Sequence, residues 1–198
     1  MSARVVGLTG PMGAGKSTVA AMLRELGAKV LDADALAYDE RSRGTVGYSA
    51  IVQTFGTKIL GEDKEVDPKK LAEEVFGDPA KLAKLEQILH PRVIARILQA
   101  RKMLRDDQVL VVEAIKLLES GLRNVCDEIW VVVAPRDVLL ERLAARGLPR
   151  AEAELRLAHQ HTEEEFRSAA DVVIENGADR DQIKERVRAE WTRRRPMP

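Results

Sequence analysis

The sequence lacks several features that mark whole classes of protein. Its 198 residues contain one cysteine, Cys126, so no disulfide can form within the chain, and we expect a reducing, cytoplasmic setting. No apolar run is long enough to span a bilayer, and the N-terminus has no signal-peptide pattern. With 32 Lys and Arg against 32 Asp and Glu, no overall field recruits nucleic acid or an anionic membrane. Since 45% of the residues are hydrophobic and 32% are charged, we expect a soluble globular protein. We expect no obligate protein partner, since the sequence shows no evidence of one.

A glycine-rich segment follows the first apolar run, at residues 5–8. It reads Gly10-Pro11-Met12-Gly13-Ala14-Gly15-Lys16-Ser17-Thr18 and has the spacing of a phosphate-binding loop, or P-loop, between a strand and a helix. Glycines tolerate positive φ, so the backbone can fold its N–H groups around a triphosphate. Lys16 would then reach the β and γ phosphates, and the Ser17 hydroxyl would bind Mg²⁺. A glycine-rich turn beside a lysine does not account for the whole pattern, so we predict ATP or GTP binding.

Apolar runs and helical periodicities alternate along the chain. Strands are expected at residues 5–8, 29–31, 109–113, 129–134 and 172–175, with helices between them, which predicts a three-layer α/β fold with a five-stranded parallel sheet. The long stretch before the third strand is helical, and Pro91 predicts two helices that meet at His90. We expect a single domain over 1–198, with a core of residues 1–33, 105–135 and 169–198. A helical acceptor-binding insertion at about 34–104 and a lid at about 136–168 complete it.

Carboxylates stand at the carboxyl ends of the second and third expected strands. In an extended stretch Asp32 and Asp34 point to one side, where Asp34 suits the orientation and deprotonation of an acceptor hydroxyl and Asp32 suits Mg²⁺. The other interpretation is that Asp34 caps a helix beginning at Ala35, and the two roles are compatible. Val112-Glu113 resembles the strand-end acid of a Walker B motif, which holds Mg²⁺ through water, or is an ordinary strand-end turn.

Two arginines stand four residues apart in the expected lid. Arg142 and Arg146 precede Gly147-Leu148-Pro149, which predicts a hinge and a second helix from Arg150. The pair either neutralises charge on the transferring phosphoryl group or forms surface ion pairs with nearby glutamates at positions 141, 152 and 154.

The histidines and the C-terminal arginines carry less information. His159 and His161 fall on different helix faces without a cysteine, so we expect no metal site there and exposed side chains. In the last helix, apolar residues recur at 183, 187 and 191 and predict packing. The basic tail is either the solvated end of that helix or a nucleic-acid patch; its arginines are at positions 186, 188, 193, 194 and 195.

Taken in order, these motifs resemble those of dephospho-coenzyme A kinases over nearly the whole chain. The resemblance rests on the glycine loop, Asp32-Ala33-Asp34, Leu89-His90-Pro91, the segment 113–122 and Ala170-Asp171-Val172-Val173-Ile174-Glu175-Asn176-Gly177. It implies a P-loop kinase fold and transfer of the ATP γ-phosphate, with Mg²⁺, to the ribose 3′-hydroxyl of dephospho-coenzyme A (dephospho-CoA). By position it implies that Asp34 is the catalytic carboxylate, that His90 lines the acceptor pocket and that Asn176 and Gly177 lie beside the adenine of ATP. It also favours a functional lid arginine, with Arg142 the first choice.

The chain departs from the family pattern at two places. Pro11 stands where the family has a second glycine, which removes one backbone donor. Lys116 replaces an apolar residue and either contacts the pyrophosphate of the acceptor or points into solvent. Other readings are a P-loop kinase of a nucleoside monophosphate or small alcohol, and a nucleotide-dependent switch or ATPase, although the chain has no Asn-Lys-x-Asp guanine signature.

The candidate site residues fall into four groups. The catalytic candidates are Asp34, Lys16 and Arg142; ATP-binding candidates are Pro11, Met12, Gly13, Ala14, Gly15, Lys16, Ser17, Thr18, Arg146, Asn176 and Gly177; acceptor-binding candidates are Asp34, His90 and Lys116; metal-binding candidates are Ser17, Asp32 and Glu113.

Overall fold

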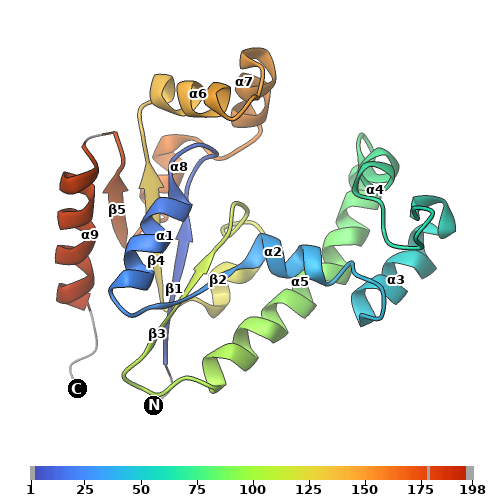
Figure 1. The fold of residues 1–198 in the computed structure, drawn as a ribbon, viewed down its shortest axis with the longest axis horizontal. Coiled ribbons are helices and arrows are strands. Elements are labelled where there is room, and N and C mark those ends of the chain that lie inside the picture. Colours follow the sequence, from blue (N-terminus) through green and yellow to red (C-terminus); the bar gives the residue numbers. More distant parts are fainter. Residues whose placement is uncertain (1–2, 178, 195–198) are drawn as a thin grey trace. The chain divides into compact units, whose positions relative to one another are not determined.

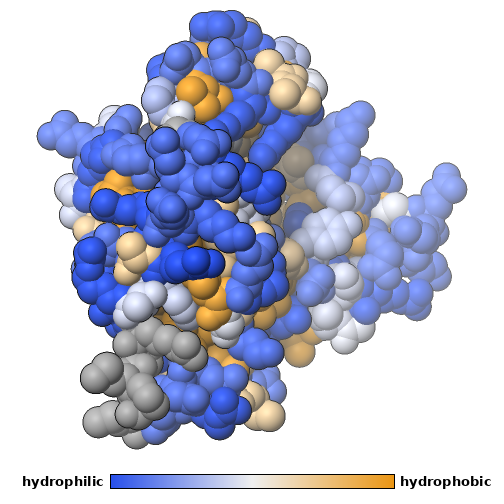
Figure 2. Space-filling model, turned by 60° about the vertical axis from the view of Figure 1, so that its left-hand side comes forward, coloured by the Kyte–Doolittle hydropathy of each residue, from blue (hydrophilic) through white to orange (hydrophobic). Residues whose placement is uncertain are grey.

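The computed structural model describes residues 3–177 and 179–194, and the chain divides into two units. Unit 1 comprises Met1–Leu31 and Ala100–Pro198, and unit 2 comprises Asp32–Gln99. Unit 2 covers much of the stretch expected as a helical insertion. The surface drawn in Figure 2 is largely hydrophilic, with apolar residues scattered in small groups. In the described part of the chain, no helix combines the length and the apolar character needed to cross a membrane.

Unit 1 is built on a five-stranded sheet in the order β2-β3-β1-β4-β5 (Figure 1). The pairs β1–β3, β1–β4 and β4–β5 are parallel, with Leu8 opposite Glu113 on one side and Trp130 on the other. These strands are short runs rich in Val and Ile, typical of parallel strands that are covered on both faces. The strands are β1 (Arg4–Thr9), β2 (Lys29–Asp32), β3 (Val109–Glu113), β4 (Glu128–Val133) and β5 (Val172–Glu175). All five strands agree with the sequence-based expectation.

Helices of unit 1 pack onto the sheet through alternate strand residues. Val6 and Leu8 of β1 join one apolar cluster with residues of four helices, whereas Gly7 faces Leu117 and Cys126 on the opposite side. This alternation follows from the period of two along a strand. The helices of unit 1 are α1 (Lys16–Glu25), α6 (Arg136–Ala145), α7 (Arg150–Ala158), α8 (Glu163–Ser168) and α9 (Arg180–Arg194), and a short 3₁₀ helix spans Leu122–Val125.

The C-terminal helix α9 is tied to the sheet by a buried carboxylate. Glu128 of β4 has a side chain that is 3% exposed and forms ion pairs with Arg4, at 2.6 Å, and with Arg194, at 2.5 Å. Arg194 is therefore partly buried, and the expectation of a solvated basic tail is wrong at this position. Arg193 is 67% exposed and pairs with Glu190, and the tail's last arginine, at position 195, lies outside the described residues.

Unit 2 is helical and has its own core. Apolar side chains from three helices meet there, where Ile51, Leu71 and Leu85 are buried together. Local capping sets the helix starts: the Thr45 hydroxyl accepts from the Tyr48 N–H, and Asp67 precedes a proline at the first helical position. The helices are α2 (Ala33–Asp39), α3 (Val46–Phe55), α4 (Pro68–Val75) and α5 (Pro79–Lys102), the last of which crosses the unit boundary, and a 3₁₀ helix spans Thr57–Ile59.

The expectation of two helices meeting at His90 is wrong. The structure has one helix, α5, with Pro91 inside it. An interior proline costs about 3 kcal/mol, but Leu89 and Val93 on either side of it are both buried at helical spacing, and that burial offsets the cost. The Arg92 guanidinium also donates to the Ile88 carbonyl and supplies a hydrogen-bond donor where the helix is disturbed.

Candidate active site

The phosphate loop of unit 1 connects β1 to α1 and has the backbone that its glycines predict. Gly10, Gly13 and Gly15 have φ of 142°, 85° and 92°. A Cβ at Gly10 would lie 2.0 Å from the Val132 carbonyl oxygen, and one at Gly15 would lie 1.9 Å from Asn176 Nδ2. Glycine is therefore required at Gly10 and Gly15 for two reasons: the backbone has positive φ, and neighbouring atoms leave no space for a Cβ.

Lys16 is held over this loop. Its side chain is buried, and Nζ donates to the carbonyl oxygens of Gly10, at 2.9 Å, and Pro11, at 3.1 Å. Both acceptors lie at the start of the loop, where Pro11 stands in place of the second glycine of the family pattern. Pro11 thus lacks an N–H but contributes its carbonyl oxygen to the position of the ammonium group.

Two of the three metal-binding candidates meet at the end of the loop. The Ser17 hydroxyl at the start of α1 donates to Glu113 Oε1 at the end of β3, at 2.8 Å. A hydroxyl and one carboxylate fit Mg²⁺, which is usually bound by one or two protein oxygens, substrate phosphates and water. Within the described residues, no three His, Cys, Asp or Glu side chains form a metal cluster, and this chemistry does not require one.

Arg142 and Asn176 hold the loop through its carbonyl groups. Arg142 Nη1 lies 3.4 Å from Gly13 O and 3.3 Å from Ala14 O, and Nη2 donates to Asn176 O at 2.8 Å. Asn176, which is 4% exposed, donates from Nδ2 to Ala14 O at 2.5 Å. The two side chains connect α6 and the end of β5 to the phosphate loop.

The ion-pair alternative for the lid arginines does not hold for Arg142. Glu154 pairs with Arg150 at 3.0 Å, and Glu152 pairs with Arg156 at 2.5 Å. Arg146 is exposed at the C-terminal end of α6, and in the described part of the chain no hydrogen bond joins its guanidinium to the phosphate loop. The structure therefore brings one of the two arginines to the loop.

The remaining lid features agree in part with expectation. Gly147 has φ of 83°, and α7 begins at Arg150 as expected. His159 is exposed, but His161 is not: its side chain is 30% exposed, lies 3.3 Å from Glu119 and packs edge-on against Phe166. The expectation of an exposed His161 is therefore wrong.

Gln160 contacts the phosphate loop, and the sequence did not predict this contact. Gln160 Oε1, just after α7, accepts a hydrogen bond from the Met12 N–H at 2.9 Å. A cavity of about 290 Å³ adjoins it, lined by Pro11, by Val133 at the end of β4 and by His161. No pattern marks Gln160, because its partner is distant in the sequence and a glutamine after a helix is unremarkable.

In unit 2, the two candidate aspartates have different local roles from those expected. Asp32 is the N-cap of α2, and its Oδ1 accepts from the Ala35 N–H at 2.9 Å. Asp34 lies in the first turn of α2 and is exposed. The helix begins two residues earlier than expected, so Asp34 is not its cap, and the two aspartates are not on one extended strand.

The other candidates are placed as follows. His90 is half-buried within α5. Lys116 is exposed in the turn after β3 in unit 1, and Thr18 is exposed in α1. Gly177 lies against the start of α6, since a Cβ there would be 2.8 Å from Cδ of Pro135, the N-cap residue of that helix.

Taken together, the parallel sheet, the phosphate loop, the inward lysine and the Ser17–Glu113 pair define a P-loop kinase of the small-molecule type. Solved structures of shikimate kinase share the fold, among them that of Bacteroides thetaiotaomicron, with a TM-score of 0.57 at 16% identity over 96% of this chain and 97% of that one. The three-layer P-loop kinase fold predicted from the sequence is therefore confirmed.

The chain belongs to the dephospho-CoA kinase family, whose model matches residues 4–182. It is 42% identical over 183 residues to the dephospho-CoA kinase of Aquifex aeolicus, covering 92% of this chain and 93% of that one. It is 43% identical over 194 residues to that of Geobacter metallireducens, covering 96% of each. The structure of the Campylobacter jejuni dephospho-CoA kinase aligns with a TM-score of 0.72 at 27% identity over 96% of each chain.

Proposed function

We propose that this chain transfers the γ-phosphoryl group of ATP to the ribose 3′-hydroxyl of dephospho-CoA and yields CoA and ADP. The observation that carries the proposal is the family match over residues 4–182, which includes the phosphate loop and both candidate aspartates. The site in unit 1 supports it, because loop amides, Lys16 and a Ser17–Glu113 pair are the groups that phosphoryl transfer from ATP requires. We propose a cytoplasmic location for this reaction.

The transfer is direct and in line. The bond between the γ-phosphorus and the bridging oxygen of ADP breaks while the acceptor 3′-oxygen forms a new bond to the same phosphorus. Asp34 orients the acceptor hydroxyl and takes its proton, and its exposure at the start of α2 leaves the carboxylate accessible to substrate. Lys16 neutralises charge on the β and γ phosphates.

Ser17 would hold Mg²⁺ directly, with Glu113 and Asp32 acting through water. The ion would neutralise phosphate charge when bound with ATP. Arg142 keeps the Gly13 and Ala14 carbonyls in place, so that the loop N–H groups face the nucleotide, with Asn176 and Gly177 beside it. The same guanidinium is our candidate for charge neutralisation on the transferring group, and Arg146 is the second. His90 and Lys116 are proposed to contact the acceptor.

A coupled assay of ADP release tests the acceptor. We expect turnover with dephospho-CoA to exceed that with AMP, adenosine or shikimate, and ADP release to depend on the acceptor. Higher activity on any of the other three would overturn the assignment. ADP release that is slow and independent of any acceptor would indicate a nucleotide-dependent switch or ATPase instead.

The role of Asp34 is tested by Asp34→Asn, with Asp39→Asn as the control on the same helix. The Asp39 side chain is 59% exposed, and its one ion pair in the described part of the chain is with Arg96, at 3.5 Å. Asp39→Asn should therefore leave kcat and KM unchanged. Asp34→Asn should lower kcat by about 10² to 10⁴ with little change in the KM for ATP, because a general base is lost. Near-normal turnover of this variant would remove Asp34 from the mechanism.

A further inference from the structure

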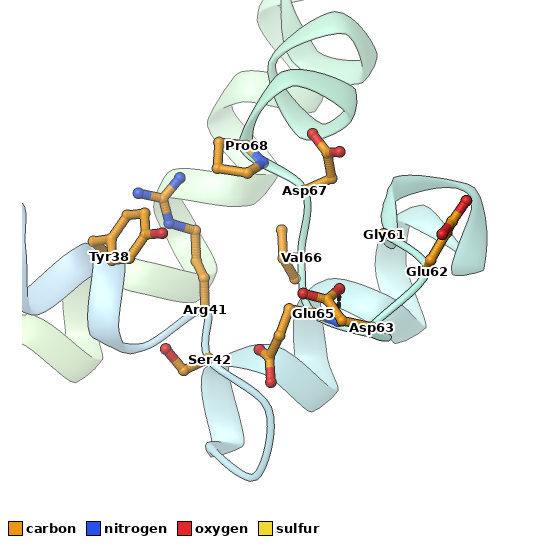
Figure 3. A pocket seen from close by; sticks show the side chains of 10 residues that line it. All are labelled: Tyr38, Arg41, Ser42, Gly61, Glu62, Asp63, Glu65, Val66, Asp67 and Pro68. Atoms are coloured by element: carbon orange, nitrogen blue, oxygen red, sulfur yellow. Dashed lines mark hydrogen bonds between the residues drawn. The ribbon is translucent and has the colours of Figure 1, made fainter.

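Unit 2 contains a cavity of about 670 Å³ that the candidate residues above do not line. Two segments face each other across it (Figure 3): residues 38–42, at the end of α2, and residues 61–68, which lead into α4. This volume is within the range of small-molecule sites, which is about 300 to 1,000 Å³.

The wall formed by residues 61–68 is held in a defined shape. Leu60 and Val66 form an antiparallel bridge, and the Gly61 N–H donates to Glu65 O at 2.9 Å. The Tyr48 hydroxyl donates to Lys64 O at 2.6 Å from α3. The cavity is therefore bounded by a braced hairpin rather than by an unsupported loop.

The opposite wall presents an arginine with unused donor capacity. The Arg41 guanidinium stacks on the Tyr38 ring, with Cζ 4.8 Å from the ring centroid. Its Nε is buried and has no hydrogen-bond partner among the described residues, and burial lowers the pKa of this guanidinium, although Tyr38 opposes the shift. No described residue accepts a hydrogen bond from this guanidinium, so an acceptor atom of a ligand in the cavity would use donor capacity that the protein leaves unused.

The remaining charges argue against an anionic ligand in this cavity. Four carboxylates line it beside the single arginine, at positions 62, 63, 65 and 67. Backbone hydrogen bonds from Lys70 and Lys69 hold the pKa of Asp67 below its usual range, and Glu65 Oε2 accepts from the Arg43 N–H at 2.7 Å. A phosphate or pyrophosphate would meet net negative charge here, whereas a neutral ligand with N–H and O–H donors would find acceptors.

The cavity borders α2, the helix that carries the proposed catalytic carboxylate, Asp34. Asp34 and Tyr38 stand four residues apart on α2 and are both exposed, so they share one helix face. Since Tyr38 lines the cavity, a ligand whose ribose is held at Asp34 would reach it by extending along this helix.

Resting on the proposed function, we infer that this cavity binds the pantetheine arm of dephospho-CoA and that Arg41 is an acceptor-specificity residue. Pantetheine is neutral and carries two amides, a hydroxyl and a geminal dimethyl group. Its carbonyl oxygens would accept from the Arg41 guanidinium, its N–H and O–H groups would donate to the carboxylates, and its methyl groups would pack against Val66 and Pro68.

Kinetics of Arg41 variants test the inference, with Arg43→Ala as the control. Arg43 is exposed two residues away and is not among the residues that line the cavity. In the described part of the chain, its one contact with Glu65 is made by its backbone N–H. Arg41→Ala should raise the KM for dephospho-CoA by about 10- to 100-fold, with a smaller rise for Arg41→Lys and little change in kcat. ADP-ribose, which has the adenosine and pyrophosphate but no pantetheine, should inhibit wild type and Arg41→Ala with similar constants.

The outcomes separate the inference from the proposed function. If wild type phosphorylates dephospho-CoA but Arg41→Ala behaves like Arg43→Ala, the inference is overturned and the function stands. An equal loss of affinity for dephospho-CoA and ADP-ribose would also overturn it, because Arg41 would then bind their shared part. If wild type does not phosphorylate dephospho-CoA, the proposed function fails.

A thiol-capture experiment reads binding without turnover. The only cysteine, Cys126, is buried, and burial raises the pKa of its thiol to about 11, so it is unreactive near neutral pH. Ser42→Cys places a thiol on the cavity wall, and Ser49→Cys places one on the exposed part of α3, outside the lining. The introduced thiolate attacks the disulfide of oxidised dephospho-CoA, forms a mixed disulfide and releases one dephospho-CoA thiolate.

Mass spectrometry then compares the rates of capture. We expect Ser42→Cys to react about 10-fold or more faster with oxidised dephospho-CoA than with oxidised glutathione, because binding raises the effective concentration of the ligand disulfide. Ser49→Cys should show no such preference. Equal rates for both disulfides at position 42 would overturn the inference, whatever the enzyme assay shows.

Discussion

Gly15→Ala is expected to destabilise the protein more than the same substitution at another glycine of similar backbone geometry. Gly15 has φ of 92° and Gly27 has φ of 98°, so alanine meets the same left-handed penalty at both. A Cβ at Gly27 has nothing within 4 Å, whereas one at Gly15 would be 1.9 Å from Asn176 Nδ2. The difference between the two variants therefore measures the contact with Asn176.

The magnitudes follow from these contacts. The left-handed backbone costs a non-glycine residue about 1–2 kcal/mol, which is the whole expectation for Gly27→Ala. At Gly15 the new methyl group must also displace the Asn176 amide from Ala14 O, a buried hydrogen bond of 2.5 Å. Its loss adds about 1–3 kcal/mol, so Gly15→Ala should cost about 2–5 kcal/mol in all.

Urea unfolding of single and double variants measures these terms. In the Asn176→Ala background the displaced hydrogen bond is already absent, so Gly15→Ala should cost about 1–3 kcal/mol less than in wild type. Gly27→Ala should add to Asn176→Ala within about 0.5 kcal/mol. Equal costs for Gly15→Ala and Gly27→Ala, or additivity of Gly15→Ala with Asn176→Ala, would refute the reasoning.

Three further predictions concern stability. Glu128→Gln should destabilise the protein by about 2–3 kcal/mol in urea unfolding, because the buried carboxylate pairs with two arginines, whereas Glu163→Gln at a 53% exposed pair should cost under about 0.5 kcal/mol. Similar losses of stability in Glu128→Gln and Glu163→Gln would contradict the role of burial in this prediction. Lys64 has φ of 64°, so Lys64→Gly should raise the free energy of unfolding of the protein by about 0.5–1 kcal/mol. A lower free energy of unfolding for this variant would show that the lysine side chain contributes more stability than the backbone strain costs. The raised pKa of Cys126, about 11, keeps its thiol protonated in the folded state while the unfolded thiol ionises near pH 9, so stability falls between pH 9 and 11. The advantage of wild type over Cys126→Ala should shrink across that range, and a constant difference would show that the thiol does not titrate differently on folding.

The glycine loop and the strands could be predicted because their causes are local. Positive φ at Gly10, Gly13 and Gly15 is a property of single residues, and runs of Val and Ile favour strands wherever both faces are covered. The order of these elements along the chain then restricts the sheet to a parallel α/β arrangement. The family resemblance adds the acceptor, which no spacing of residues specifies.

Helix boundaries in unit 2 were less predictable because two local rules compete there. Asp32 and Asp34 are both good N-cap residues, and the structure uses Asp32. Pro91 favours a helix break, yet α5 continues because Leu89 and Val93 are buried on either side of it. At Pro91 burial of the neighbouring apolar residues outweighed the local signal, whereas at the start of α2 two equivalent local signals competed.

Contacts between distant segments lie beyond any local pattern. The spacing of Arg142 and Arg146 leaves their role open, and the family resemblance favours Arg142. Its hydrogen bonds to the loop carbonyls and to Asn176, however, depend on how α6 and the end of β5 approach the loop. Gln160 and Arg41 carry no signal at all, since a glutamine after a helix and an arginine in a turn are ordinary until packing supplies a partner or removes solvent. Backbone preferences thus specify the phosphate loop and the sheet from the residues alone. Packing assigns the side chains that hold the loop and line the cavity, because only the folded chain brings them together.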